Sequence, residues 1–307
     1  NAGNIGGATM AETILVGTAA CQGCVISCGR VVEVKEGPYA TGGEAKGPEY
    51  ETLCAFGSQL LVDDMAQITA LGDRCDRLGM DTISAGNTIA LAYLLFDRGL
   101  ISAADTGGLR LAWGDASPCF TLLEQMARRE GFGALLAEGS QALAEHFGAP
   151  ELAVTVNRLE VPMHDPRAHT GQAISYAVSP RGACHNQSDF FMVEMGNSMD
   201  EIGVPMTERL VDSGKAGAVA RHQHFRTVQN SLTMCFFASV SAAEVAELLS
   251  AVSQREIGVE EMMTAGERAW NLKRLYNGRL GLRAANDKLP KLLLEPLEEG
   301  GQMGHVP

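Results

Sequence analysis

Apolar positions along this chain follow a helical period over most of its length. Met65, Ile68, Leu71, Cys75 and Leu78 recur at the three-and-four spacing of one helix face, which predicts a helix there. An N-cap and first-turn proline at Ser117-Pro118 predict a second helix, with Phe120, Leu123 and Met126 on one side. A further helix is expected through Leu136 and Leu143, after Gly131 and Gly133. A capping box at Ser241–Glu244 and a long amphipathic pattern over Glu260–Tyr276 predict two more. The sequence therefore predicts a mostly α fold.

The stretch from Glu160 to Arg181 breaks this pattern. Three prolines and a glycine separate short apolar pieces there, so we expect an irregular loop of the kind that carries active-site residues. No repeat of 20–50 residues is visible. We place a domain boundary near residue 155, which gives helical domains at 3–155 and 156–307. Residues 1 and 2 resemble the remnant of an expression tag.

Composition narrows the class of protein. The 307 residues are 46% hydrophobic and carry a formal net charge of −13, which argues against nucleic acid or an anionic membrane as a partner. The longest apolar run, Ile89–Phe96, is far shorter than the roughly 20 residues that span a bilayer. No signal peptide is visible. Clustered cysteines suit metal binding in a reducing compartment, so we expect a cytoplasmic protein that acts on small substrates.

The densest chemical signal is a C-x₂-C-x₃-C array formed by Cys21, Cys24 and Cys28. Three thiolates in eight residues can surround one metal centre but need a fourth ligand from elsewhere. Buried free cysteines and zinc are the alternatives, and zinc is disfavoured because no partner cysteine or histidine pair follows at finger spacing. The spacing favours a [4Fe–4S] cluster.

Other segments are ambiguous when each is taken alone. The two acids of Asp76-Arg-Leu-Gly-Met-Asp81 can contact a bound heterocycle, or they can be solvated charges at a glycine helix stop. Glu49 and Glu51 can be helix-start acids or include a general base. His185 can be structural or can serve as an acid or oxyanion donor, and Cys235 is ordinarily a core residue.

Together the segments resemble the tungsten-dependent aldehyde ferredoxin oxidoreductase family. The residues that carry the resemblance occur in order along nearly the whole chain. They are Cys21-x₂-Cys24-x₃-Cys28, Pro48-Glu-Tyr-Glu-Thr52, Asp76-Arg-Leu-Gly-Met-Asp81, Ala127-Arg-Arg-Glu-Gly-Phe-Gly133, His164-Asp-Pro-Arg167, Ser179-Pro-Arg-Gly182 with His185, the run Gly266–Asn277, and Asp287-Lys-Leu-Pro290. Single pieces are weak, but the ordered set is specific.

In this family tungsten, or sometimes molybdenum, is held by two pterins, and a [4Fe–4S] cluster lies close by. The resemblance implies that the cluster ligands are Cys21, Cys24, Cys28 and Cys235. It implies that the pterin contacts include Asp76, Gly79, Asp81, Arg181 and Asn230. It implies catalytic roles beside the metal for Glu51 and His185, with Glu49 the less favoured acid. The family's N-terminal β-domain has no counterpart, so we expect the C-terminal helical domains alone.

The sequence departs from the family pattern at three positions. Asn230 stands where an aspartate is expected, Thr233 where a glycine is expected, and Cys184 where an acid commonly precedes the histidine. The reaction implied is oxidation of an aldehyde to a carboxylic acid, with electrons passed through the cluster to ferredoxin or a partner subunit. A homodimer is compatible with this interpretation, and we expect the isolated fragment to lack pterin and to be inactive.

Three alternatives stay open at this point. The chain can belong to a paralogue with another low-potential reaction, such as reduction of an aromatic acyl thioester. It can be a [4Fe–4S] electron-transfer module that holds no pterin. It can also be a scaffold fragment without catalytic activity.

Overall fold

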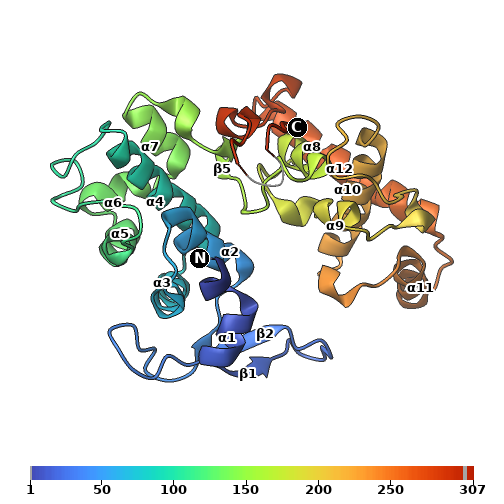
Figure 1. Ribbon diagram of the computed structural model, residues 1–307. Helices are drawn as coiled ribbons and strands as arrows, with labels where there is room; N and C mark the ends of the chain where they lie inside the picture. Colours follow the sequence, from blue (N-terminus) through green and yellow to red (C-terminus); the bar gives the residue numbers. More distant parts are fainter. Residues whose placement is uncertain (1, 300–302) are drawn as a thin grey trace. The chain divides into compact units, whose positions relative to one another are not determined.

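The computed structural model describes residues 2–299 and 303–307. It divides into two compact units, of which one ends at Val154 and the other begins at Thr155 (Figure 1). Helix makes up 52% and strand 6%, so the expected mostly α fold is confirmed. No helix among the described residues is both long and apolar enough to cross a membrane. Of the expected tag remnant, residue 1 lies outside the described residues and Ala2 opens a short 3₁₀ helix.

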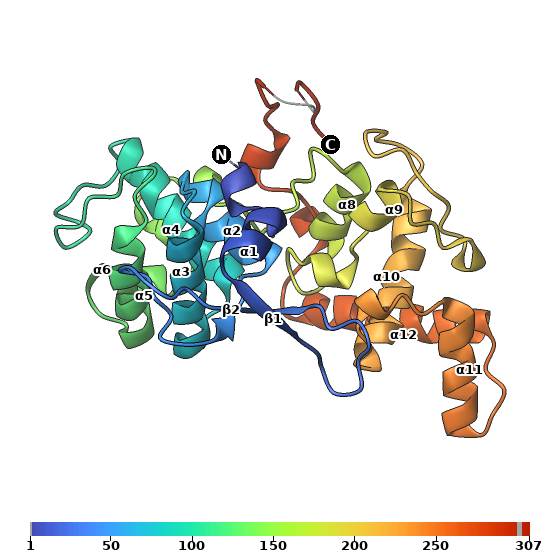
Figure 2. The same cartoon turned by 60° about the horizontal axis from the view of Figure 1, so that its bottom comes forward.

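The first unit combines a small sheet with a group of helices. Its strands pair antiparallel in the order β1-β2-β3, and β1 lies beside α1 (Figure 2). The elements of this unit are η1 (Ala2–Ile5), α1 (Gly7–Thr13), β1 (Leu15–Ala19), β2 (Gly29–Val32), β3 (Ala45–Lys46), α2 (Tyr50–Phe56), η2 (Ser58–Leu60), α3 (Met65–Leu78), α4 (Thr82–Asp97), α5 (Ser117–Arg128), α6 (Gly131–Leu136), α7 (Ser140–His146) and η3 (Pro150–Leu152).

Helix α4 is the centre of the first unit. It contains the apolar run Ile89–Phe96 and is buried around most of its circumference, which is why it shows no amphipathic pattern. It packs against α2, α3, α5 and α7. Gly86 permits the close approach of α2, since a Cβ atom there would lie 2.5 Å from the Cβ of Ala55. The core of this unit therefore depends on one helix that is buried on most sides.

Helix boundaries in the first unit agree with the sequence prediction at α3 and differ at α5 and α6. The predicted helix over Met65–Leu78 is confirmed, with the carboxylate of Asp64 accepting from two backbone N–H groups at its start. At α5 the first residue is Ser117, and the carboxylate of Asp115 accepts from its N–H. The predicted helix through residues 136–143 is two short helices, α6 and α7, separated at Gly139, whose φ is +88°.

The second unit is also helical, with one two-stranded antiparallel sheet. Its three longest helices, α10, α11 and α12, come late in the chain. The elements are β4 (Thr155–Val156), β5 (Leu159–Glu160), α8 (Thr170–Val178), η4 (His185–Gln187), α9 (Phe191–Glu194), η5 (Asp200–Ile202), α10 (Ala216–Ser231), η6 (Phe236–Ala238), α11 (Ala242–Ser253), α12 (Val259–Arg279), η7 (Ala284–Asn286) and η8 (Lys291–Leu294).

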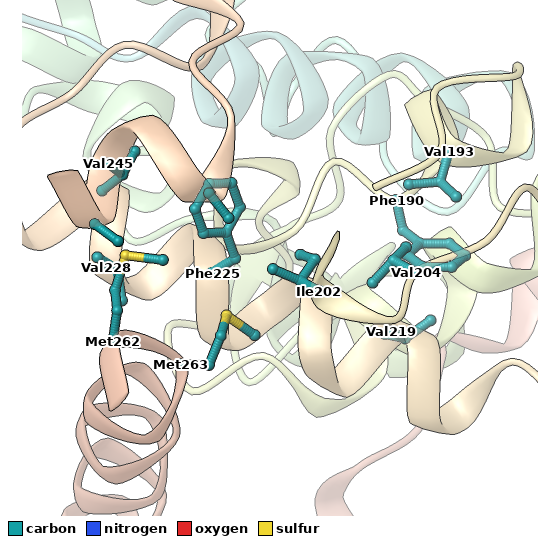
Figure 3. Packing of buried hydrophobic residues seen from close by; sticks show 12 residues of the cluster. Phe190, Val193, Ile202, Val204, Val219, Phe225, Val228, Val245, Met262 and Met263 are labelled. Atoms are coloured by element: carbon teal, nitrogen blue, oxygen red, sulfur yellow. The ribbon is translucent and has the colours of Figure 1, made fainter. Parts of the chain in front are cut away.

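Apolar side chains from α10, α11 and α12 form the core of the second unit. Figure 3 shows Phe225 and Val228 of α10 close to Met262 and Met263 of α12, with Val245 of α11 nearby. The predicted capping box opens α11 as expected: the Ser241 side chain accepts from the Glu244 N–H while the Glu244 carboxylate accepts from the Ser241 N–H. The predicted long helix over 260–276 is also confirmed, as α12.

The expectation of an irregular loop from Glu160 to Arg181 is wrong in its second half, where α8 forms. Tertiary contacts stabilise this helix despite its weak sequence signal. Buried Glu194 accepts from the N–H of Gly171 at 2.7 Å and from the ammonium of Lys215 at 2.6 Å. Burial raises the pKa of Glu194, and its hydrogen bonds to Lys215 and to the backbone oppose that shift. These contacts are made by residues distant in sequence, so local patterns did not reveal them.

Candidate functional site

The three clustered cysteines lie on the loop that joins β1 to β2. The last paired residues of this hairpin are Ala19 and Gly29, so the loop comprises residues 20–28. The N–H of Cys24 donates to the carbonyl of Cys21 at 3.0 Å, and Gly23 between them has a φ of +72°. This turn places Cys21 and Cys24 on one short bend of the loop. Gly29 is required where the strands meet, because a Cβ atom there would lie 2.7 Å from the carbonyl oxygen of Ala19.

All eight cysteines are free thiols, and they differ in exposure. Cys21 and Cys28 are exposed and Cys24 is half-buried, as expected for ligands, whereas Cys75, Cys119 and Cys184 are buried. Burial raises the pKa of Cys75 and of Cys119 to about 12, which keeps both protonated and unsuited to metal ligation. The exposed set fits a soft metal centre by its donor chemistry. The participation of Cys235 in it stays a prediction.

The motif Asp76-Arg-Leu-Gly79-Met-Asp81 forms the junction between α3 and α4. Gly79 ends α3 with a φ of +69°, its N–H donates to the carbonyl of Asp76, and the N–H of Met80 donates to the carbonyl of Cys75 at 2.9 Å. This pair of bonds is a Schellman motif. Asp81 then starts α4 by accepting from the N–H of Ser84 at 2.7 Å. Both acids are exposed, and the Asp76 carboxylate lies 3.9 Å from the ammonium of Lys46.

The motif Asn230-Ser-Leu-Thr233-Met-Cys235 ends α10 in the same way. The N–H of Thr233 donates to the carbonyl of Asn230, and the N–H of Met234 donates to the carbonyl of Gln229 at 2.9 Å. Thr233 has a φ of +55°, so a β-branched residue occupies the left-handed position that a Schellman motif ordinarily gives to glycine. The resemblance leads us to expect glycine here, and glycine would adopt this backbone conformation without strain. Cys235 follows, exposed, at the start of η6.

The two motifs thus share one local structure, which also ends other helices of this chain, among them α4 and α5. In this structure Asp76 corresponds to Asn230, Gly79 to Thr233, and Asp81 to Cys235. Each places its first polar side chain in the last turn of a helix and its last one just beyond the turn. Contact of these two helix ends with two pterins is what the resemblance implies, and it stays a prediction.

Glu49 and Glu51 have different surroundings in the first unit. Glu49 is the residue before α2, and its carboxylate pairs with the guanidinium of Arg30 from β2. Glu51 is in the first turn of α2 and is half-buried. The preference for Glu51 over Glu49 as the base stays a prediction.

His185 begins η4, and one face of α10 holds the residues around it. Three polar side chains spaced four apart on α10 contact the segment directly after His185, so they act as a row of anchors. Their contacts are Ser188 Oγ to His222 Nδ1 at 2.8 Å, Arg226 Nη2 to Asp189 Oδ2 at 2.7 Å, and Asn230 Nδ2 to the carbonyl of Asn186 at 3.0 Å. Asn230, expected as a pterin contact, thus has a structural bond beside His185. Complete burial lowers the pKa of His222 to about 4, so this anchor is neutral.

The loop before His185 is fixed by α12. The guanidinium of Arg274 pairs with Asp287 and donates to the carbonyl of Val178 at 3.2 Å, while the Asn277 amide donates to the carbonyl of Pro180. The late sequence motifs that carried the resemblance therefore position the Ser-Pro-Arg-Gly loop. Arg181 on this loop is exposed, and its guanidinium approaches the Cys184 sulfur at 3.8 Å.

A pocket of about 540 Å³ in the second unit adjoins Arg181. Gln187, Lys273, Tyr276 and Asn277 also line it, so two cations, two amides and an aromatic ring border one volume. Burial lowers the pKa of Lys273. The position of Arg181 beside this pocket is compatible with contact to a cofactor, and that contact stays a prediction.

Sequence reasoning missed the neighbours of His185 in the second unit. His164 lies beside it with ring centroids 5.3 Å apart, and Phe191 lies 4.2 Å from His164. It also missed the anchoring row on α10. The polar spacing of His222, Arg226 and Asn230 along one helix face was the available signal for that row. Whether Glu51 faces the same cleft as His185 stays a prediction, because each belongs to a different unit.

The chain is similar to known proteins over nearly its whole length. A family model described as "Aldehyde ferredoxin oxidoreductase, domains 2 & 3" matches residues 1–307. The chain is 38% identical over 307 residues to a tungsten-containing aldehyde ferredoxin oxidoreductase of Pyrococcus furiosus, a match that covers 98% of this chain and 49% of the relative. It is 34% identical to the protein of the same description from Thermococcus kodakarensis, with the same coverage.

Two further similarities are more distant. An aliphatic sulfonate oxidoreductase, WOR-like subunit, of Pyrococcus furiosus is 32% identical over 174 residues, which are 54% of this chain and 28% of that one. A solved structure of the active site complex BamBC of benzoyl coenzyme A reductase shares the fold, with a TM-score of 0.71 and 16% identity over 92% of this chain and 48% of that one.

The first relatives are about twice as long as this chain, which spans 49% of their length. The match along all 307 residues nevertheless includes both helix-ending motifs and the cysteine loop. The chain belongs to the aldehyde ferredoxin oxidoreductase family, and it corresponds to that family's domains 2 and 3.

Proposed function

We propose that this chain forms part of an oxidoreductase that converts an aldehyde and water to a carboxylic acid and passes two electrons to ferredoxin or a partner subunit. The observation that carries the proposal is the 38% identity to a tungsten-containing aldehyde ferredoxin oxidoreductase over 98% of the chain. The ordered motifs on which a cluster and two pterins would rest support the same conclusion. The whole enzyme includes more than this chain, since the relatives are twice as long.

The residues present fit the cofactors that the family uses. Cys21, Cys24 and Cys28 would hold a [4Fe–4S] cluster, with Cys235 as the fourth ligand. The exposed side chains of Asp76, Asp81 and Asn230, at two similar helix ends, would contact the pterins that hold tungsten or molybdenum. When bound, the metal supplies two-electron oxidation and the cluster carries the electrons onward one at a time.

The chain's own residues supply acid–base chemistry and position. Glu51, which is half-buried in the first turn of α2, takes a proton from the water or hydrated aldehyde. His185 donates a hydrogen bond to the substrate oxygen as negative charge develops there. The anchors on α10 fix the segment of His185, so its imidazole does not have to be ordered during the reaction.

The test is metal analysis together with turnover in the assembled enzyme that carries this chain. Tungsten or molybdenum with about four irons per chain, and reduction of a viologen dye that depends on added aldehyde, would support the proposal. Iron without tungsten or molybdenum would instead identify an electron-transfer module that lacks pterin. A third outcome would identify a paralogue with a different reaction. In that case iron is present together with tungsten or molybdenum, no aldehyde reduces the dye, and an aromatic acyl thioester oxidises a reduced dye.

The chain on its own is proposed to hold no pterin and to be inactive, because the relatives contain another half of similar length. Stoichiometric tungsten or molybdenum in the purified 307-residue chain would contradict this part of the proposal. Aldehyde oxidation by that chain alone would contradict it equally.

A further inference from the structure

Arg226 on α10 contacts two segments of the second unit, and each segment carries a candidate site residue. We call residues 185–189 the His185 segment and residues 235–238 the Cys235 segment. The guanidinium donates to the Asp189 carboxylate of the first segment through Nε at 2.5 Å and through Nη2 at 2.7 Å. Its Cζ atom lies 5.3 Å from the centroid of the Phe236 ring in the second segment. One side chain therefore contacts both segments.

The guanidinium of Arg226 uses its edges and its face for different contacts. Its Nη1 donates to the side-chain oxygen of Gln229 on the same helix at 2.5 Å. The carbonyl of Gln229 accepts from the N–H of Met234 at 2.9 Å, in the turn that leads to the Cys235 segment. A planar cation can make bidentate bonds along its edges while it lies over an aromatic ring. Arginine therefore suits this position by its shape as well as by its charge.

Burial strengthens the contact between Arg226 and Asp189, since both residues are buried. A buried charge that loses its partner is left without solvation, so the pair resists separation. Asp189 Oδ1 also lies 3.8 Å from His222 Nε2. Burial lowers the pKa of His222 to about 4, so that ring is neutral and the carboxylate charge is balanced by Arg226. The ion pair therefore holds the His185 segment to α10.

Residues of both segments also line one pocket of about 510 Å³ in the second unit. Asp189 belongs to the His185 segment, Phe236 and Phe237 belong to the Cys235 segment, and Arg226 lines the pocket with them. A pocket of this size holds many water molecules, since one water takes about 30 Å³. Walls on opposite sides of such a space gain no packing from one another. The contacts of Arg226 therefore contribute a large part of what fixes the two segments relative to each other.

We propose that Arg226 is a positioning residue that fixes the His185 segment and the Cys235 segment relative to each other. The proposal rests on the proposed function, which gives His185 a bond to the substrate oxygen and Cys235 a bond to the cluster. One guanidinium then positions both the hydrogen-bond donor of the reaction and the fourth ligand of the electron carrier. Its loss disturbs both segments at once, whereas loss of a contact to one segment disturbs that segment alone.

The test is amide hydrogen–deuterium exchange of the 307-residue chain, without added metal. Arg226→Lys keeps the positive charge, but an ammonium cannot make the bidentate bonds and the ring contact together. In this variant we expect exchange to become about tenfold faster both at residues 187–188 and at residues 234–239, because charge-assisted bonds that order both segments are lost. Exchange in the middle of α11 and in α4 should match the parent chain.

His222→Gln is the matched control, because it alters a contact of α10 with Ser188 and leaves Arg226 in place. It should leave exchange at residues 234–239 unchanged. Phe236→Leu removes the ring beside the guanidinium and keeps an apolar side chain, so it should speed exchange at residues 234–239.

Faster exchange at residues 187–188 alone in Arg226→Lys would overturn the proposal. A uniform rise throughout the second unit would also overturn it, because it would show a role in overall stability only. If Arg226→Lys does not fold, Phe236→Leu decides, and unchanged exchange at residues 234–239 in that variant would overturn the proposal.

The exchange measurement needs neither cofactor nor turnover, so it separates this proposal from the proposed function. In the assembled enzyme we expect Arg226→Lys to lower kcat by roughly tenfold or more with KM little changed, because reacting groups are misplaced. It should also shift the midpoint potential of the cluster, which a merely structural loss would leave in place. Joint loosening of both segments with unchanged kcat and potential would retain Arg226 as their link and contradict the proposed roles of His185 and Cys235.

Discussion

At the scale of single residues, local bonding gives individual side chains distinct structural roles. Glu49 at the start of α2 pairs with Arg30 of β2. Asn230 retains a hydrogen bond to the carbonyl of Asn186 through an amide N–H, which an ionised aspartate at the same position cannot donate. Asparagine in place of aspartate therefore removes a negative charge and adds a hydrogen bond that holds the segment beside His185.

The assignment of Glu51 as the base predicts a large and selective loss of activity. In the assembled enzyme, Glu51→Gln should lower turnover by roughly 10²-fold or more, because a general base contributes on that order. His185→Ala should do likewise, with tungsten and iron content unchanged in both. Glu49→Gln is the matched control and should cost much less. Steady-state kinetics and metal analysis check this, and a Glu49 variant without activity beside an active Glu51 variant would reverse the assignment.

Thr233 predicts a stabilising substitution. A β-branched residue with positive φ is strained by about 1–2 kcal/mol, and glycine relieves that strain at a modest cost in chain entropy. Thr233→Gly should therefore raise the free energy of unfolding by up to about 1 kcal/mol, measured by urea denaturation. Thr227→Gly, at a helical position of α10, should lower it. Destabilisation by both substitutions to a similar extent would show that the turn is not strained.

His222 predicts a pH dependence of stability. Burial lowers its pKa from the ordinary 6.5 to about 4, so the unfolded chain binds the proton first as pH falls. This contribution to stability is complete above pH 6.5 and is lost toward pH 4, at about 1.4 kcal/mol per pH unit. In His222→Gln the fall in unfolding free energy between pH 7 and pH 4.5 should be smaller, while His146→Gln should follow the parent chain. Equal slopes in all three proteins would contradict the assignment.

At the scale of elements, helices with strong local signals were predictable and helices stabilised by distant contacts were not. The period over Met65–Leu78, the Ser241 capping box and the amphipathic pattern of α12 all identified real helices. Helix α8 was missed because its stability depends on Glu194 and Lys215, which follow it in sequence by many residues. Gly139 divided a predicted helix into α6 and α7 because its φ of +88° does not occur within a helix.

The close crossing of α2 and α4 predicts opposite effects for two similar substitutions. Gly86→Ala should lower the free energy of unfolding by about 1–3 kcal/mol, because the added Cβ would lie 2.5 Å from that of Ala55. Gly278→Ala, in α12 where the added Cβ meets nothing within 4 Å, should raise it by about 0.5–1 kcal/mol. Urea denaturation of both variants measures this, and a stabilising Gly86→Ala would show that the helices can move apart.

At the scale of the whole molecule, the order of motifs identified the family although no single motif did. The family model and the relatives confirm that identification over the full chain. The sequence could not reveal the His164–His185 pair, because it depends on how the second unit packs. For the anchors of α10, the polar spacing along one helix face was the one available signal. It did indicate the two six-residue motifs, and the structure adds that both are Schellman motifs at helix ends.

The central claim is that the hairpin cysteines and Cys235 together hold one [4Fe–4S] cluster. The most direct measurement is the iron content and electron paramagnetic resonance spectrum of the chain after anaerobic reconstitution, for the parent, Cys235→Ser and Cys119→Ser. We predict about four irons per chain and a reduced-cluster signal in the parent and in Cys119→Ser, whose thiol is buried. Cys235→Ser should lose the cluster or alter its signal. Four irons and an unchanged spectrum in Cys235→Ser would contradict the claim.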